Sequence, residues 1–139
     1  MSIAHHLVAL MVLKKIINSN RLRTIQGSFG WIDHRFITGG FLEQLVAAEI
    51  SLYLFLVAVA DRNGLSFYAD QRICRLLKMD LSAFGHARQG LCEKSLIAYE
   101  PPLYQVLSLP KQPVTPSSTD NNCRQQNLQH IQKIKEMLA

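Results

Sequence analysis

Apolar residues recur at helical spacing near the start of the chain. Leu10 and Met11 follow Leu7 by three and four residues, and an Asn-Ser-Asn segment at 18–20 ends the pattern. This spacing predicts a helix over residues 3–19. Because the helix would be apolar on more than one face, we expect it to pack on the main domain or at a dimer contact. The alternative is a helix that lies in a membrane interface.

Residues 20–40 contain four glycines and no long periodic run. This composition predicts a loop with one short strand around Trp31. Asp33 and His34 are adjacent, so on an extended chain their side chains point to opposite faces, and no nucleophile is near them in the sequence. We therefore expect Trp31 to pack against the core and this segment to have no catalytic role.

The longest periodic stretch opens a domain that we assign to residues 41–109. Residues 41–61 have a helical pattern, with a short helix at 41–46 that leads into a longer one from Ala47. The stretch Asp61–Gly64 ends this helix, because glycine readily adopts a left-handed conformation. Apolar side chains at i, i+3, i+4 and i+7 predict the core-facing side of the helix. They are Leu52, Phe55, Leu56 and Val59.

The rest of the domain alternates short extended runs with two helices. Residues 65–68 predict a brief strand, and residues 69–79 predict a second helix with Ile73, Leu76 and Leu77 as its apolar side chains. A third helix follows to about Lys94, with either Asp80 or Ser82 as its N-cap. Its inward-facing residues are expected to be Phe84, Ala87 and Leu91.

Two extended runs close the domain. Residues 96–99 and 103–109 are separated by Glu100-Pro101-Pro102, and proline cannot donate to a strand ladder. We predict a β-hairpin here. The proline-rich residues 110–122 predict a flexible linker. Residues 123–139 predict an amphipathic helix that is too short to be stable alone, so a partner or a second copy should cover its apolar side.

Composition and charge narrow the choice of function. With 139 residues, 48% apolar and 18% charged, the chain fits one packed domain and neither a disordered protein nor a coiled-coil rod. The net charge of +5 is unevenly placed: residues 1–40 have five basic residues against one acidic, whereas residues 41–110 have six basic and seven acidic. Whole-chain charge is therefore weak evidence for a nucleic-acid partner, because phosphate binding needs local positive charge.

Several classes of site have no signature in the sequence. Three widely spaced cysteines predict neither a disulfide framework nor a zinc site, which favours a reducing cytoplasm. Cys74 is expected to be a small buried apolar residue. No apolar run is long enough to cross a bilayer, and no nucleophile motif or phosphate-binding glycine loop is present. We therefore expect no enzyme activity, metal, cofactor or membrane association.

The order of helix, short strand, two helices and hairpin carries a resemblance. The pattern of a second helix-turn-helix helix is matched by Ile73, Cys74, Leu77 and Met79. The pattern of a recognition helix followed by a Leu-Ile pair is matched by residues between 84 and 97. Residues 52–109 resemble the winged helix-turn-helix domains of bacterial replication initiators and transcriptional regulators. The later positions are Phe84, Ala87, Leu91, Leu96 and Ile97. The resemblance implies an α+β fold, mainly helical, with a C-terminal hairpin wing.

The resemblance also implies double-stranded DNA as the partner and a set of contact residues. The second helix would cross the phosphate backbone, with Arg72 and Arg75 on one face. Its contacting residues would be Gln71, Arg72, Arg75 and Lys78. The third helix would lie in the major groove. Its groove-facing positions would be Ser82, Ala83, Gly85, His86 and Gln89, with Arg88 added depending on the rotation of the helix.

Other residues extend or oppose this interpretation. Arg21, Arg23 and Arg35 lie in the basic N-terminal stretch, which forms either an arm along the DNA or a solvated loop. Asp80 and Glu100 place acids at the third helix and the wing, where basic residues favour DNA. The alternative function is therefore a protein-interaction module on the same scaffold. In both cases the two terminal helices lead us to expect a homodimer.

Overall fold

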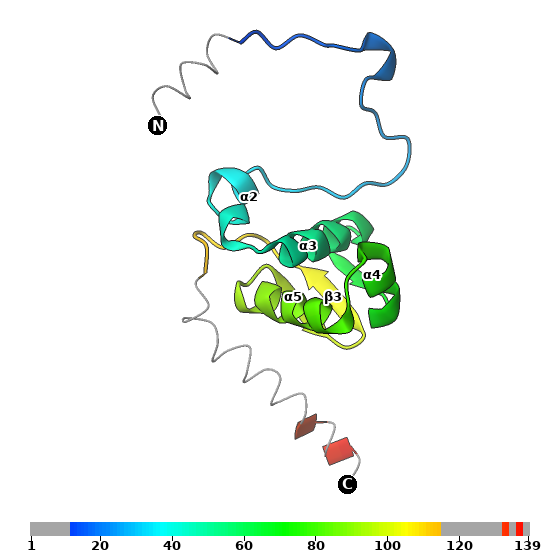
Figure 1. The fold of residues 1–139 in the computed structure, drawn as a ribbon, viewed down its shortest axis with the longest axis vertical. Helices are drawn as coiled ribbons and strands as arrows, with labels where there is room; N and C mark the ends of the chain where they lie inside the picture. The colour runs from blue at the N-terminus through cyan, green and yellow to red at the C-terminus, as the bar shows by residue number, and fades with distance from the viewer. Residues whose placement is uncertain (1–11, 115–131, 134–135, 138–139) are drawn as a thin grey trace.

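The fold combines helices with one small antiparallel sheet. The computed structural model describes residues 12–114, 132–133 and 136–137, and within them four α-helices and three strands form a mixed α+β domain. α3, α4 and α5 gather beside the sheet, while a long N-terminal segment extends away from them (Figure 1). The α+β class expected from the sequence is therefore correct.

The N-terminal segment differs from the sequence prediction. Residues 12–18 form no helix, and residues 19–21 form a single 3₁₀ turn, η1 (Ser19–Arg21). All side chains from 12 to 34 are exposed, so no tertiary packing supports a helix that is marginal alone. The described part of the predicted 3–19 helix is thus wrong, and residues 3–11 lie outside the described residues.

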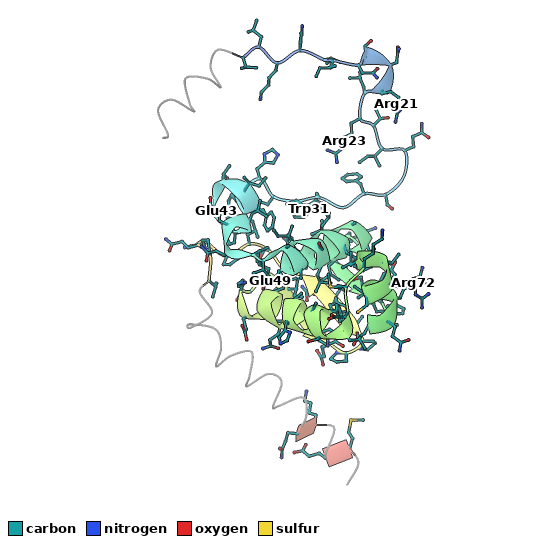
Figure 2. All side chains as sticks on the ribbon, viewed as in Figure 1. Arg21, Arg23, Trp31, Glu43, Glu49 and Arg72 are labelled. Atoms are coloured by element: carbon teal, nitrogen blue, oxygen red, sulfur yellow. The ribbon has the colours of Figure 1, made fainter. Side chains whose placement is uncertain are left out.

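The strand expected around Trp31 is also absent from this segment. The backbone there is irregular, and it leads into the short helix α2 (Arg35–Thr38). The Trp31 side chain is 71% exposed, so it does not pack into the core as expected. Figure 2 shows Trp31 on the loop that passes over α3. This loop lies close to α3 because Gly30 has no side chain: a Cβ atom there would collide with the Val57 carbonyl oxygen.

The central helix begins and ends where the sequence predicts. A short 3₁₀ turn, η2 (Leu42–Gln44), precedes α3 (Ala47–Val59). Leu52 and Leu56 are fully buried, as their spacing predicts. After α3 the chain turns tightly, because the Asp61 carboxylate accepts hydrogen bonds from the Asn63 and Leu65 backbone N–H groups at 2.8 and 2.9 Å, and Gly64 has a φ of +84°.

Two helices follow with a short connection. α4 (Asp70–Leu77) ends at Lys78, which has a left-handed φ of 56°. α5 (Leu81–Glu93) begins after Asp80, whose carboxylate accepts a hydrogen bond from the Ala83 backbone N–H at 2.7 Å. Asp80 is therefore the N-cap, and Ser82 is not. The three inward-facing residues predicted for α5 are all buried, namely Phe84, Ala87 and Leu91.

The three strands form a sheet in the order β1-β3-β2. β1 (Leu65–Phe67) and β2 (Ile97–Glu100) both pair antiparallel with β3 (Leu103–Val106). The hairpin is thus correct, although β3 ends three residues before the predicted limit. In the register, Tyr104 lies between Ser66 and Tyr99. Tyr104 is 1% exposed, so this row of the sheet faces the helices.

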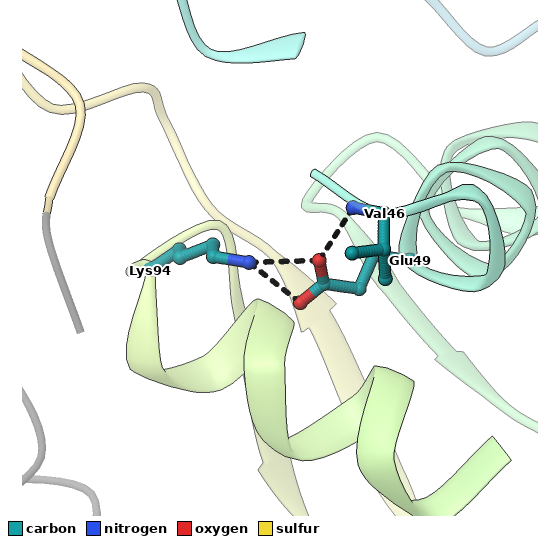
Figure 3. A network of polar contacts seen from close by, with 3 residues as sticks. All are labelled: Val46, Glu49 and Lys94. Carbon is teal, nitrogen blue, oxygen red and sulfur yellow. Dashed lines mark hydrogen bonds and ion pairs between the residues drawn. The ribbon is translucent and has the colours of Figure 1, made fainter. Parts of the chain in front are cut away.

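A buried ion pair joins α3 to α5. The Lys94 ammonium donates to both Glu49 carboxylate oxygens at 2.7 and 2.8 Å, and the Val46 backbone N–H donates to the same carboxylate at 2.8 Å (Figure 3). Glu49 is buried, so the two hydrogen-bond donors compensate the loss of hydration. The same carboxylate completes the N-terminal cap of α3.

The end of the chain is described in part. Residues 110–114 form neither a helix nor a strand, and the rest of the predicted linker, residues 115–122, lies outside the described residues. The predicted helix over 123–139 lies mostly outside the described residues, and the four residues described there, 132–133 and 136–137, are helical. Among the described residues, no helix is long and apolar enough to span a membrane.

Candidate functional site

The exposed side of α4 carries the basic residues that the sequence analysis selected. Arg72, Arg75 and Lys78 are exposed, as is Gln71 (Arg72 in Figure 2). The Arg72 guanidinium lies 5.6 Å from the centre of the Tyr68 ring. Within the described part of the chain, no carboxylate lies within ion-pair distance of these three cations. Their positive charge is therefore available to an anion from outside the domain.

The first half of α5 offers fewer polar groups. Ser82 and His86 are exposed, and a Cβ atom on Gly85 would meet no other atom within 4 Å, so this surface is open. Gln89 is half-buried, and its side-chain amide donates to the Glu93 carboxylate at 3.0 Å. His86 and Ser82 are thus the most accessible polar side chains predicted on this helix.

Arg88 has a different environment from the other predicted contact residues. Its guanidinium donates to the Asp70 carboxylate at 3.2 Å and to the Tyr104 hydroxyl at 3.1 Å. It also lies 4.3 Å from the Tyr99 ring centre and 4.9 Å from that of Phe84. Arg88 therefore connects α4, α5 and the hairpin inside the domain, and no pattern in the sequence indicated these contacts.

The contact between Arg88 and Tyr104 affects the pKa values of both side chains. Burial lowers the pKa of Arg88, but the Tyr104 hydroxyl and the nearby negative charge outweigh this effect, so the pKa is raised. Burial raises the pKa of Tyr104 to about 12, although the adjacent guanidinium opposes the shift. Tyr104 consequently stays protonated at neutral pH, and its ring lies 4.6 Å from that of Tyr99.

The N-terminal arginines divide into two kinds. Arg21 and Arg23 are exposed on the N-terminal segment, well separated from Arg72 on α4 (Figure 2). Arg35 instead donates to the backbone carbonyls of Leu109 and Pro110 at 3.3 and 2.6 Å. It ties the start of α2 to the segment after β3. The structure thus does not gather the three N-terminal arginines into one site with α4.

Exposed apolar residues lie near the same helices. Leu76 on α4 and Leu81 at the start of α5 are more than half exposed. Phe67 of β1 and Leu103 of β3 are paired across the sheet and both exposed, Phe67 to 70%. Glu100, at the end of β2, is exposed beside them. The hairpin end is therefore apolar and acidic, without a basic side chain.

The described residues contain no cluster that would hold a metal ion. No group of three or more His, Cys, Asp or Glu residues suited to a metal ion occurs in the described ranges. Cys74 is buried, as expected, and burial raises the pKa of its thiol, with the charges of Asp70 and Asp80 contributing.

Comparison with models of known protein families, with curated proteins and with solved structures finds no match.

Proposed function

We propose that residues 41–109 are a winged helix-turn-helix domain that binds double-stranded DNA, in the regulation of transcription or in replication. The order of elements supports this proposal: α3, β1, α4, α5 and the β2–β3 hairpin follow one another as in that fold, and β3 lies between β1 and β2. The short connection from α4 to α5, with Asp80 as N-cap, is typical of a helix-turn-helix.

The observation that carries the proposal is the unpaired positive charge on α4. Arg72 and Arg75 of α4 and Lys78 at its C-terminal cap place three exposed cations close together in the sequence, and no carboxylate of the described residues forms an ion pair with them. Each phosphate that a cation neutralises releases condensed counterions, which favours binding to a duplex. We assign these residues, with Gln71, to the DNA backbone.

In this proposal α5 contacts base edges through only a few side chains. Its open surface around Gly85 would admit the edge of a base pair, with His86 and Ser82 as the polar groups that reach it. Arg88 is engaged by Asp70 and Tyr104, so we assign it to holding α5 against α4 and the wing. With few base-reading side chains, the domain should discriminate weakly among sequences.

A salt titration tests the assignment of α4. Fluorescence anisotropy with a labelled random duplex should give a Kd below about 10 µM at low salt. The Arg72→Ala/Arg75→Ala variant should bind all sequences more weakly, and the slope of log K against log salt should fall by about 2, because two phosphate contacts are lost.

A matched variant separates local contacts from net charge. Arg62→Ala/Lys111→Ala also removes two exposed cations, but neither residue lies on α4 or α5. Its salt slope should stay at the wild-type value. Equal slopes for the two double variants would remove Arg72 and Arg75 from the phosphate contacts.

The exposed apolar residues favour a second candidate, a protein-interaction module. Phe67 and Leu103 form an exposed pair beside Glu100, and Leu76 and Leu81 add apolar surface on the helices. Such groups gain little from a polyanion, whereas a protein partner would cover them. No binding to the duplex below tens of micromolar at low salt would favour this function over the first.

A further inference from the structure

A cavity lies on a side of the domain that α4 and α5 do not reach. Its volume is about 400 Å³, within the range of small-molecule sites. The lining comes from the N-terminal loop, the C-terminal half of α3, the turn at 61–64 and the segment that includes the end of β3. No lining residue belongs to α4 or α5, so the proposed DNA surface plays no part in it.

Close backbone contacts build the walls of this cavity. Gly30 brings the N-terminal loop against the Val57 carbonyl of α3, where a larger residue would collide. Gly64 brings the turn against β3, and its carbonyl accepts a hydrogen bond from the Val106 backbone N–H at 2.8 Å. Arg35 holds the segment after β3 in place by donating hydrogen bonds to the carbonyls of Leu109 and Pro110. The cavity is therefore shaped by specific contacts between four segments.

Aromatic rings supply much of the lining surface. Trp31 and Phe29 line the cavity and are nevertheless mostly exposed, which leaves ring surface uncovered. Tyr53 lines the cavity as well, and its ring stacks on Phe36 at 4.8 Å, which holds it in place. Burial raises the pKa of Tyr53, with the charge of Asp33 contributing, so its hydroxyl is protonated at neutral pH. Planar rings can stack on such surfaces.

The charges of the lining cancel. The lining contains two acids, Asp33 and Asp61, and two bases, Arg35 and Arg62. Backbone N–H groups already bind one oxygen of each carboxylate. The neutral Asn63, Ser108 and Tyr53 side chains add both hydrogen-bond donors and acceptors. A ligand with a full charge of either sign would meet one repulsive and one attractive pair, so no net attraction would compensate its lost hydration, whereas an uncharged polar ligand loses less hydration.

We propose that this cavity binds an uncharged, planar heteroaromatic compound that carries hydrogen-bond donors and acceptors along its edge. The ring stacks on Trp31 and Phe29, and the polar edge meets the side chains of Tyr53, Asn63 and Ser108. The cavity shares no residue with α4 or α5, so a ligand there would not occupy the proposed DNA surface on those helices.

Three bicyclic probes of similar size test the site. They are 2-quinolone, which is a neutral lactam, 2-naphthoate, which is anionic, and 2-naphthylmethylammonium, which is cationic. The titration follows the indole N–H signal of Trp31, the single tryptophan of the chain, and the amides of Gly30 and Gly64 by NMR. We expect 2-quinolone to shift all three signals with a Kd in the millimolar range or tighter, and the charged probes to bind at least tenfold more weakly.

Two variants locate the binding. Trp31→Ala removes an exposed ring and should weaken 2-quinolone binding at least tenfold, as followed by the glycine amides. Leu22→Ala removes an exposed apolar side chain of the same N-terminal segment that does not line the cavity, and its Kd should equal that of wild type. Absence of shifts, equal weakening in both variants, or tighter binding of a charged probe would overturn the proposal.

Discussion

The guanidinium of Arg88 joins α4, α5 and the hairpin, because it lies between the Asp70 carboxylate and the Tyr104 hydroxyl. Its position on α5 made it a candidate for base contact, yet it binds Asp70 and Tyr104 and lies against the Tyr99 ring. A hydrogen bond to a charged group contributes more to stability than a neutral one. Arg88 therefore fixes the position of α5 relative to α4 and the hairpin, and the proposed insertion of α5 into a DNA groove would depend on that position.

Tyr104 makes this contact sensitive to high pH. An unfolded tyrosine ionises near pH 10, whereas Tyr104 in the fold ionises at about pH 12. Between these values the unfolded chain has lost the proton and the folded chain retains it. The free energy of unfolding should thus fall as pH rises above 10, by at most about 3 kcal/mol, and the full contribution is present below pH 10.

Urea unfolding at pH 9, 10 and 11 measures this loss in the wild type and in Tyr104→Phe. The variant should have lower stability at neutral pH because it lacks the hydroxyl that accepts a hydrogen bond from Arg88. Its stability should decline less with pH than that of wild type, since the other tyrosines are common to both proteins. Parallel declines would assign the pH dependence to those other tyrosines.

Single residues of the site were predictable where the signal was local. The periodicity of α4 located Arg72 and Arg75 on an exposed face, and Asp80 was one of two N-cap candidates. The hydrogen-bond partners of Arg88 and Arg35 are 16 to 75 residues away in the sequence, so no local pattern could reveal them. The exposure of Trp31 was missed for the same reason, because it depends on how the loop passes over α3.

At the scale of elements, α3 and α5 approach closely at one point. Gly90 of α5 lies against the Glu49 carboxylate of α3, and a Cβ atom there would collide with it. Glu49 binds Lys94 and the Val46 backbone N–H, so its displacement would break a buried network. The small residue at 90 allows the ion pair and the helix contact to exist together.

Alanine in place of each of the two glycines of α5 distinguishes the effect of the Gly90–Glu49 contact on stability from the effect of helix propensity. Gly90→Ala should lower the free energy of unfolding by roughly 2–3 kcal/mol, because loss of a buried pair outweighs the gain of about 1 kcal/mol from alanine in a helix. Gly85→Ala meets no atom within 4 Å and should stabilise by up to about 1 kcal/mol. Thermal unfolding by circular dichroism compares the two, and similar stabilities would contradict the packing argument.

The elements that the sequence predicted correctly share one property. α3, α4, α5 and the hairpin each have an apolar side that another element covers, so local pattern and tertiary packing agree. Residues 12–18 have a helical pattern but no such cover, and they form no helix. Within residues 12–114, the periodic patterns that formed helices are thus those that another element covers.

At the scale of the whole molecule, the cations proposed to contact DNA lie in two places. Arg72, Arg75 and Lys78 lie on α4 and its C-terminal cap, and Arg21 and Arg23 lie on the extended N-terminal segment. The described residues from 12 to 32 contain no acid, so this segment is cationic along its length. A duplex bound at α4 could also meet the segment, and both sets of phosphates would then contribute to the salt dependence.

The Arg21→Ala/Arg23→Ala variant tests whether the segment acts as an arm. If it does, the slope of log K against log salt should fall by about 2, and combination with Arg72→Ala/Arg75→Ala should lower it by about 4, because distant contacts add. Anisotropy titrations at several salt concentrations provide both slopes. An unchanged slope in the first variant would place the arm in solution and leave α4 as the sole phosphate contact among these residues. Since all four arginines are exposed, loss of folding should not complicate the comparison.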